Sequence, residues 1–131
     1  MSRGLKNCNP GNIRHSANRY RGEVRPSRDA AFKQFESLEW GYRALFVTLR
    51  TYARKYGLKS IREMISRWAP PSENATESYI RAVCERTGFS PDEPLDTHNK
   101  HHMLPLAAAI SEVENGTPAD PHPIARAWQL L

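Results

Sequence analysis

Residues 37–57 read "SLEWGYRALFVTLRTYARKYG" and carry the clearest structural pattern in the chain. Apolar and aromatic side chains recur there every three or four residues, which is the spacing of one face of an α-helix. Ser37 suits the N-cap, Glu39 suits the first turn, and Gly57 suits the C-terminal stop. The pattern predicts a long amphipathic helix whose aromatic stripe belongs to the core.

Two shorter helices downstream have recognisable starts and ends. Ser60 and Glu63 form a capping box before an apolar helical face, and a double proline ends that helix. Asn74 or Thr76 can cap the next helix, which Gly88 ends. The middle of the chain is therefore predicted to be helical.

The other segments are less regular. The first thirty-five residues have no helical period, although the pieces "GNIRH" and "AAFKQFE" can form small strands. Residues 89–102 are mostly turn, with room for one short helical stretch. The last long helix runs to about Val113, with Pro105 in its first turn or at a kink, and the tail is weakly helical. We expect a mainly α (α+β) fold, one domain over residues 1–131, with an irregular or small β segment at the N-terminus.

Composition limits the class of function. The net charge of +5 and the pI near 9.5 favour an anionic partner such as nucleic acid, a membrane surface or an acidic wall polymer. No nucleic-acid-binding signature accompanies the charge, so no specific nucleic acid is expected. Because no stretch approaches the about 18 apolar residues of a membrane span and no apolar leader is present, we expect no membrane insertion and no signal peptide. Cys8 and Cys84 are expected to be free thiols.

A search for catalytic motifs leaves one carboxylate. The chain lacks the G-x-S-x-G elbow, the Walker A loop and the dinucleotide glycine motif. Its histidine cluster at residues 98–102 has no recognised zinc spacing, so neither a metal site nor a cofactor is expected. Glu114 lies just before Asn115 and Gly116, at a helix end where the dipole disfavours a negative charge. Such a local cost is typical of a functional site.

The segment around Glu114 also resembles a known family. "LAAAISEVENG" resembles the catalytic helix of lysozyme-like lytic transglycosylases, in which an apolar run leads to a glutamate, a small polar residue and a glycine. "NATESYIRAV" resembles the family motif Glu-Thr-x-x-Tyr-Val-x-x-Val, matched here by Thr76, Tyr79, Ile80 and Val83. Ala75 occupies its glutamate position. In that family the tyrosine lines the sugar-binding cleft.

A second resemblance covers more of the chain. "NCNPGNIR", "FKQFESLEWGYRAL" and "RWAPPSEN" are similar to small phage and prophage proteins known as virion lysins or structural protein P5. Both resemblances imply a lysozyme-like fold. In transglycosylases, however, the glutamate helix precedes the tyrosine motif, whereas Glu114 comes last here. A circular permutation would reconcile the two orders and would place Glu114 beside the loop at residues 9–12.

The resemblance implies a muramidase or lytic transglycosylase that cleaves the β-1,4 bond between N-acetylmuramic acid and N-acetylglucosamine. Glu114 would be the general acid and base. A second carboxylate, if one is used, would come from Asp29, Glu36 or Glu73. The residues expected to bind substrate are Tyr79, Asn9, Asn12, Trp68 and Thr76. For these the residues alone leave purely structural roles open, such as a buried tyrosine or tryptophan and asparagines that tie up a turn.

Two other classes of function stay open. One is a catalytically inactive phage or prophage structural protein that binds cell-wall glycan. The other is a small basic domain that binds nucleic acid through Arg14, Arg19, Arg21 and Arg25. The expected partners are peptidoglycan glycan strands, with virion components as a second class. A chain made in the cytoplasm without a leader would reach the wall through a virion, a holin pore or lysis.

Overall fold

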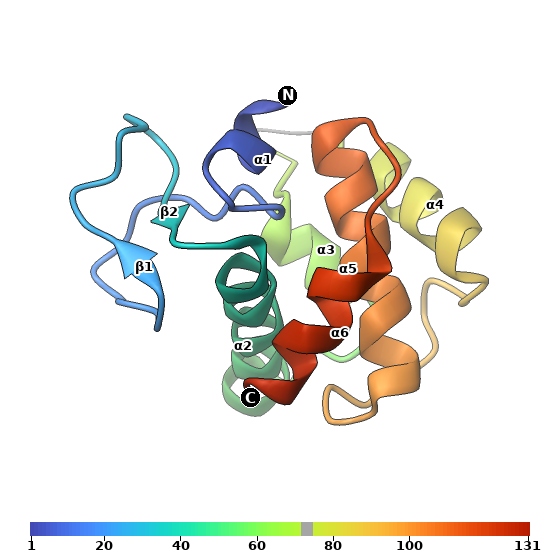
Figure 1. Cartoon of the computed structure of the whole chain (residues 1–131). Coiled ribbons are helices and arrows are strands. Elements are labelled where there is room, and N and C mark those ends of the chain that lie inside the picture. Colours follow the sequence, from blue (N-terminus) through green and yellow to red (C-terminus); the bar gives the residue numbers. More distant parts are fainter. Residues whose placement is uncertain (72–74) are drawn as a thin grey trace.

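The computed structural model describes residues 1–71 and 75–131 and is mainly helical (Figure 1). One small antiparallel sheet accompanies the helices, so the predicted mainly α (α+β) fold is confirmed. We call residues 1–36 the N-terminal arm and α2 to α6 the helical body. The elements are α1 (Arg3–Lys6), β1 (Glu23–Val24), β2 (Gln34–Phe35), α2 (Leu38–Tyr56), α3 (Ile61–Trp68), α4 (Thr76–Thr87), α5 (Lys100–Asn115) and α6 (Pro121–Gln129).

The predicted ends of α2 and α3 are confirmed. The Ser37 hydroxyl accepts the Trp40 N–H, and Gly57 ends α2 in the left-handed conformation with φ of 68°. Ser60 and Glu63 form the expected capping box at α3. No described helix has both the length and the apolar character that crossing a membrane requires.

The helical body packs around aliphatic side chains. Helix α2 lies against α6 and α5, and α4 lies against α5. The aromatic stripe of α2 is only partly core, because Tyr42 is buried whereas Tyr56 is 44% exposed. Burial of aliphatic surface supplies the main stabilisation of this region. Fully buried members of the core are Leu45, Phe46, Leu49, Ile61, Met64, Ile65, Met103, Leu106 and Ile110.

Helix α4 begins differently from the expectation. Asn74 lies outside the described residues, and the N-cap position is Ala75, which offers no side-chain bond. Thr76 is the first helical residue rather than the cap. Its hydroxyl donates to the Ala69 carbonyl at 2.5 Å, which links the start of α4 to the end of α3. Gly88 ends the helix as predicted.

The last two helices are longer than the sequence indicated. Asn99 caps α5 through a bond from the His101 N–H, so the first turn takes in residues expected to be turn. Pro105 lies inside α5, in its second turn, and the helix continues to Asn115. The tail forms α6, because Asp120 caps it and a proline occupies its first position.

The N-terminal arm is held by polar contacts. Strands β1 and β2 pair Glu23 with Phe35, and an isolated bridge pairs Arg14 with Phe32. The predicted "AAFKQFE" strand is therefore confirmed in part, whereas "GNIRH" contributes only the bridge. Lys33 is 1% exposed and its ammonium lies 3.1 Å from the Glu23 carboxylate. Helix α1 was not predicted, since one turn is too short to show a period.

The start of the chain meets the end of α5. The Ser2 hydroxyl donates to Asn115 Oδ1 at 2.7 Å, and Asn115 Nδ2 donates to the Pro10 carbonyl at 2.9 Å. This confirms the expectation that the Glu114 segment lies beside the Asn-Pro-Gly-Asn loop. The C-terminus itself lies at the opposite end of the molecule from the N-terminus, after α6 (Figure 1).

Candidate functional site

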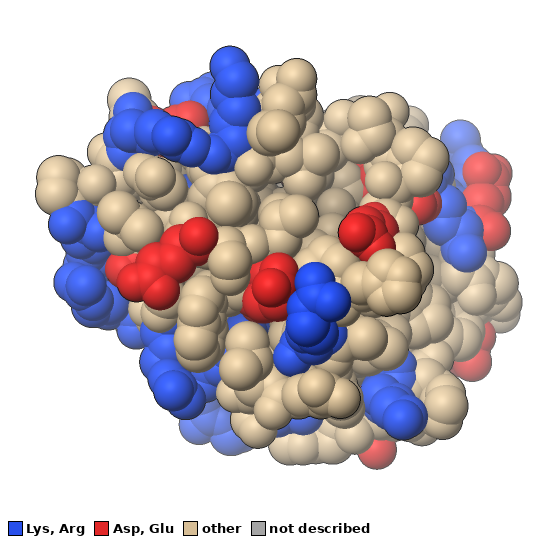
Figure 2. Space-filling view, viewed as in Figure 1, with Lys and Arg blue, Asp and Glu red and all other residues tan. Residues whose placement is uncertain are grey.

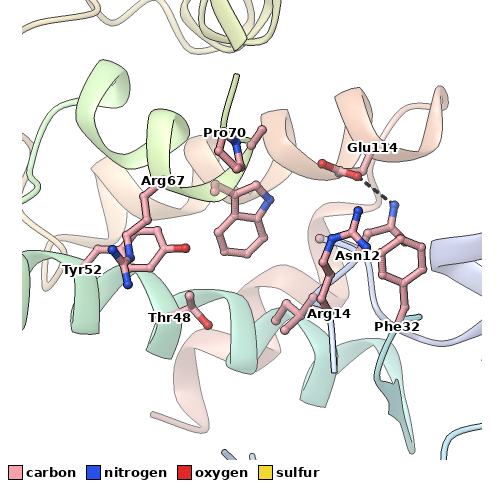
Figure 3. Close-up of a pocket in the computed structure, with 12 residues that line it drawn as sticks. Asn12, Arg14, Phe32, Thr48, Tyr52, Arg67, Pro70 and Glu114 are labelled. Carbon is pink, nitrogen blue, oxygen red and sulfur yellow. Dashed lines mark hydrogen bonds between the residues drawn. The ribbon is translucent and has the colours of Figure 1, made fainter. Parts of the chain in front are cut away.

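A pocket of about 320 Å³ lies where the N-terminal arm meets the helical body (Figure 3). Its walls come from the loop after α1, from the segment before β2, from α2, from the end of α3 and from the last turn of α5. We call it the Glu114 pocket. The lining residues are Gly11, Asn12, Ile13, Arg14, Phe32, Thr48, Tyr52, Arg67, Trp68, Ala69, Pro70 and Glu114.

The Glu114 carboxyl group is held by two neutral donors from distant parts of the chain. Asn12 Nδ2 donates to Oε1 at 2.8 Å, and the Tyr79 hydroxyl donates to Oε2 at 2.8 Å. The side chain is half-buried and lines the pocket. Three elements therefore fix one acid, which gives it a defined position from which to act on a bound molecule.

The loop that carries Asn12 has an unusual backbone. Asn12 adopts φ of 51°, a left-handed conformation that asparagine tolerates better than most residues. Gly11 precedes it, and a Cβ there would lie 2.6 Å from the Trp68 ring, so only glycine allows the loop to approach that wall. Asn12 Oδ1 is buried and finds no hydrogen-bond partner among the described residues. This backbone conformation points the amide nitrogen at Glu114. It costs free energy locally, because the backbone is left-handed and Oδ1 is unpaired among the described residues.

Tyr79 reaches the acid from behind the pocket. It is 8% exposed and does not belong to the lining, so it contacts Glu114 rather than the open space. Burial is the main cause that raises the pKa of the phenol, and the negative charge of Glu114 and its hydrogen bond act in the same direction. The Trp68 side chain opposes this increase. Tyr79 therefore keeps its proton and can donate to the carboxylate throughout the physiological range.

The rest of the pocket wall is aromatic and basic. Trp68 is half-buried and its ring lies 6.4 Å from that of Tyr52 in a T-shaped arrangement. The guanidinium of Arg67 lies 5.4 Å from the Tyr52 ring, and that of Arg14 lies 5.3 Å from the Phe32 ring. Such a surface suits the apolar face of a sugar and an attached anion.

Sequence reasoning found three of the lining residues and missed others. Glu114, Asn12 and Trp68 all line the pocket. Phe32 lies in the predicted strand piece "AAFKQFE", and Tyr52 belongs to the aromatic stripe that was predicted to be core. Tyr52 lies near the C-terminal end of α2, where residues 50–56 are half-buried or exposed.

Three predicted binding residues lie outside the pocket lining and need correction: Tyr79, which contacts Glu114 from behind, Asn9 and Thr76. Asn9 is fully buried, with its amide nitrogen donating to the Ile13 and Lys33 carbonyls and its oxygen accepting the Ile13 N–H. No polar atom of that side chain is left for a sugar, so Asn9 shapes the loop. Thr76 is 7% exposed and its hydroxyl is used by the Ala69 carbonyl. It is therefore a structural residue.

The other candidate carboxylates are placed elsewhere. Asp29 binds the Arg3 guanidinium at 2.7 Å, and this bond, with backbone N–H donors, holds the pKa of Asp29 well below its usual range. Glu36 is exposed and outside the lining, and Glu73 lies outside the described residues. Within the described part of the pocket wall, Glu114 is the one acid.

Comparison with known proteins gives a relative that spans most of the chain. No protein-family model matches the sequence. Protein P5 of Pseudoalteromonas phage PM2 is 40% identical over 119 residues, a stretch that covers 88% of this chain and 72% of the phage protein. The match agrees with the resemblance to phage proteins of this type. The chain belongs to the family of phage Protein P5.

Proposed function

We propose that this protein degrades peptidoglycan by cleaving the β-1,4 bond between N-acetylmuramic acid and N-acetylglucosamine. The observation that carries the proposal is the Glu114 carboxyl group, fixed at a pocket by Asn12 and Tyr79. The resemblance of its helix to the catalytic helix of lytic transglycosylases supports the same assignment. The aromatic wall gives the sugar rings a surface on which to pack.

The first step is protonation of the leaving group. Glu114 donates its proton to the glycosidic oxygen while the bond to the muramic acid carbon breaks, and the N-acetylglucosamine side leaves with a free hydroxyl. Asn12 and Tyr79 then stabilise the negative charge that the carboxylate acquires, because both donate to it. These two residues position the acid, and Glu114 is the group that touches the reacting atoms.

The second step favours ring closure over hydrolysis. Hydrolases with two carboxylates place the second one about 5–9.5 Å from the first. Glu114 is the one acid among the described lining residues, so a nucleophile from the substrate itself fits better. A hydroxyl of the muramic acid attacks its own anomeric carbon, and Glu114 takes up the hydroxyl proton to complete the cycle. The product is an anhydro sugar, as in a lytic transglycosylase.

Clearing of purified cell walls tests the proposal. We expect the wild-type protein to clear a wall suspension and the Glu114→Gln variant to clear it at least roughly 100-fold more slowly, since general acid catalysis contributes about that much or more. Glu36→Gln is the matched control, because Glu36 is exposed and lies outside the pocket lining. Unchanged circular dichroism would show that each variant folds.

The outcomes separate the main alternatives. Clearing that survives in Glu114→Gln removes the catalytic assignment. Binding to walls without clearing by the wild type supports a phage structural protein that binds glycan. Membership in a phage protein family is compatible with delivery to the wall by a virion or at lysis.

A further inference from the structure

A second cavity, of about 490 Å³, collects positive charge beside the Glu114 pocket. Its lining includes five cationic side chains, and no acid is among the described residues that line it. We call it the cationic groove. Its cations come from the segment before β1, from α2 and from α3: Arg19, Arg21, Arg43, Lys55 and Arg67.

These cations are not neutralised within the described structure. The ion pairs among described residues involve other basic side chains, at Arg3, Arg25, Lys33, Arg62, Arg86 and Arg126. Burial and, next, the charge of Arg21 lower the pKa of Arg43, which shows how closely the positive charges lie. An arrangement that concentrates like charge without a counter-charge is poised to bind an anion.

Aromatic rings, rather than acids, hold three of these cations in place, and Arg43 Nε donates to the Leu130 carbonyl. The Arg21 guanidinium lies 5.3 Å from the Trp40 ring, and the Arg67 guanidinium lies 3.9 Å from the Tyr56 ring. The Lys55 ammonium lies 5.5 Å from the same Tyr56 ring. Stacking on rings orders a cation without using its charge, so the hydrogen-bond donors stay available to a ligand.

The cationic groove is continuous with the Glu114 pocket. Thr48, Tyr52 and Arg67 line both cavities, and the Tyr20 hydroxyl lies 3.0 Å from the Thr48 hydroxyl at their boundary. Figure 3 shows Thr48, Tyr52 and Arg67 at one end of the pocket and Glu114 at the other. A strand bound at Glu114 would therefore extend from the Glu114 carboxyl group toward the cationic groove.

We propose that the cationic groove binds the free carboxylates of the peptide stem carried by the same peptidoglycan strand that occupies the Glu114 pocket. This inference rests on the proposed function, because it takes the glycan strand as the occupant of that pocket. In intact peptidoglycan the carboxylates lie on the stems and the sugars are neutral. The groove would thus select stem-bearing strands over uncharged amino-sugar polymers.

The continuity of the cationic groove with the Glu114 pocket favours stem carboxylates over nucleic acid as the ligand. Nucleic acid would require a basic surface along its whole footprint, whereas the cationic groove ends at a pocket that contains the Glu114 carboxyl group. A glycan strand presents neutral sugars and, at intervals, an anionic stem. The sugars match the Glu114 pocket, and the stem matches the adjoining cationic groove. Duplex DNA therefore serves as a competitor in the test.

The test measures binding in a Glu114→Gln background, so that cleavage does not alter the ligand. Sacculi freed of secondary wall polymers are used intact, or after their carboxyl groups have been converted to neutral amides with carbodiimide and excess methylamine. The groove variant is Arg21→Gln with Lys55→Gln. The matched control is Arg54→Gln with Lys59→Gln, which removes the same charge from another cavity on α2.

We expect amidation to weaken sedimentation with sacculi roughly tenfold, the range expected for loss of two or three exposed ion pairs. The groove variant should bind intact sacculi about as weakly as the parent binds amidated sacculi. It should bind the two preparations equally, whereas the control variant should still bind intact sacculi more tightly than amidated ones. Equal binding to both preparations by the parent, an equal loss in the control variant, or full displacement by duplex DNA would overturn the proposal. Because binding is measured without cleavage, failed catalysis would contradict the proposed function alone.

Discussion

The helical body buries mainly aliphatic side chains from α2, α3 and α5, whereas most of the side chains that the N-terminal arm buries are polar, with Phe35 as the large apolar exception. In the arm Asn7, Asn9, Glu23 and Lys33 are all at most 6% exposed, and each has hydrogen-bond partners. Figure 2 shows Lys and Arg side chains gathered along the edge of the molecule that the arm forms. One region is therefore built by burial of apolar surface and the other by satisfied polar groups.

The comparison explains why the site lies at the boundary. The body supplies Glu114 and Tyr79 on helices, which hold side chains rigidly. The arm supplies Asn12 on a loop whose backbone adopts a conformation that regular elements do not offer. Asn115 joins the two regions by bonds to Ser2 and to Pro10.

The largest loss of stability is expected in the body. Leu49→Ala removes a fully buried side chain of α2 and should lower the free energy of unfolding by about 2–5 kcal/mol. Urea unfolding followed by circular dichroism measures this loss. Leu131→Ala is the control, since Leu131 is exposed, and a loss for Leu49→Ala no greater than for the control would contradict the assignment of the core.

A smaller loss is expected in the arm. Asn9→Ala removes the side-chain donor to the Ile13 and Lys33 carbonyls and the acceptor of the Ile13 N–H, although the Ile13 carbonyl keeps the Lys33 N–H. The change should cost about 1–3 kcal/mol. Limited proteolysis should then cut first within residues 10–36 while the helices stay protected. The exposed Asn18→Ala is the control. Equal resistance of both variants would show that the Asn9 bonds do not hold the arm.

The bond between Tyr79 and Glu114 affects activity more than stability. Tyr79→Phe keeps the buried ring and removes the hydroxyl, so clearing of cell walls should fall roughly tenfold, as a hydrogen bond to a charged group is worth about 1.5–3 kcal/mol. The melting temperature should change little. Glu36→Gln, on an exposed side chain outside the pocket lining, should leave both quantities unchanged, and an equally active Tyr79→Phe would remove its positioning role.

The smallest effect concerns pH and the arm. Because Arg3 and backbone donors lower the pKa of Asp29 in the folded chain, this carboxylate adds stability above its ordinary pKa of 3.8. That stability is lost as the pH falls below 3.8 toward the folded value. Between pH 5 and pH 2 the melting temperature of the wild type should therefore approach that of Asp29→Asn. A constant difference across this range, with Glu36→Gln as the control, would contradict the role of Asp29.

The body could be predicted from sequence because its determinants are local. Ser37 with Gly57, and Ser60 with Glu63, act within a few residues of the helix ends that they fix. The start of α5 was predicted less well. Pro105 suggested a helix that begins or kinks at that residue, whereas tertiary packing keeps α5 helical through it.

The arm and half of the site could not be predicted in this way. Asn9 and Asn12 look alike in sequence, two polar residues of one turn, yet one is buried in backbone bonds and the other faces Glu114. That difference depends on partners about 20 and 100 residues away along the chain. The resemblance to transglycosylases pointed to Glu114 and Tyr79 without showing that they touch each other.

Mass spectrometry of peptidoglycan incubated with the purified protein tests most directly whether arm and body together build a catalytic acid. We predict release of muropeptides that end in anhydro-muramic acid, and none above background with Glu114→Gln. Release of the same fragments by the variant, or none by a folded wild type, would contradict the assignment of Glu114.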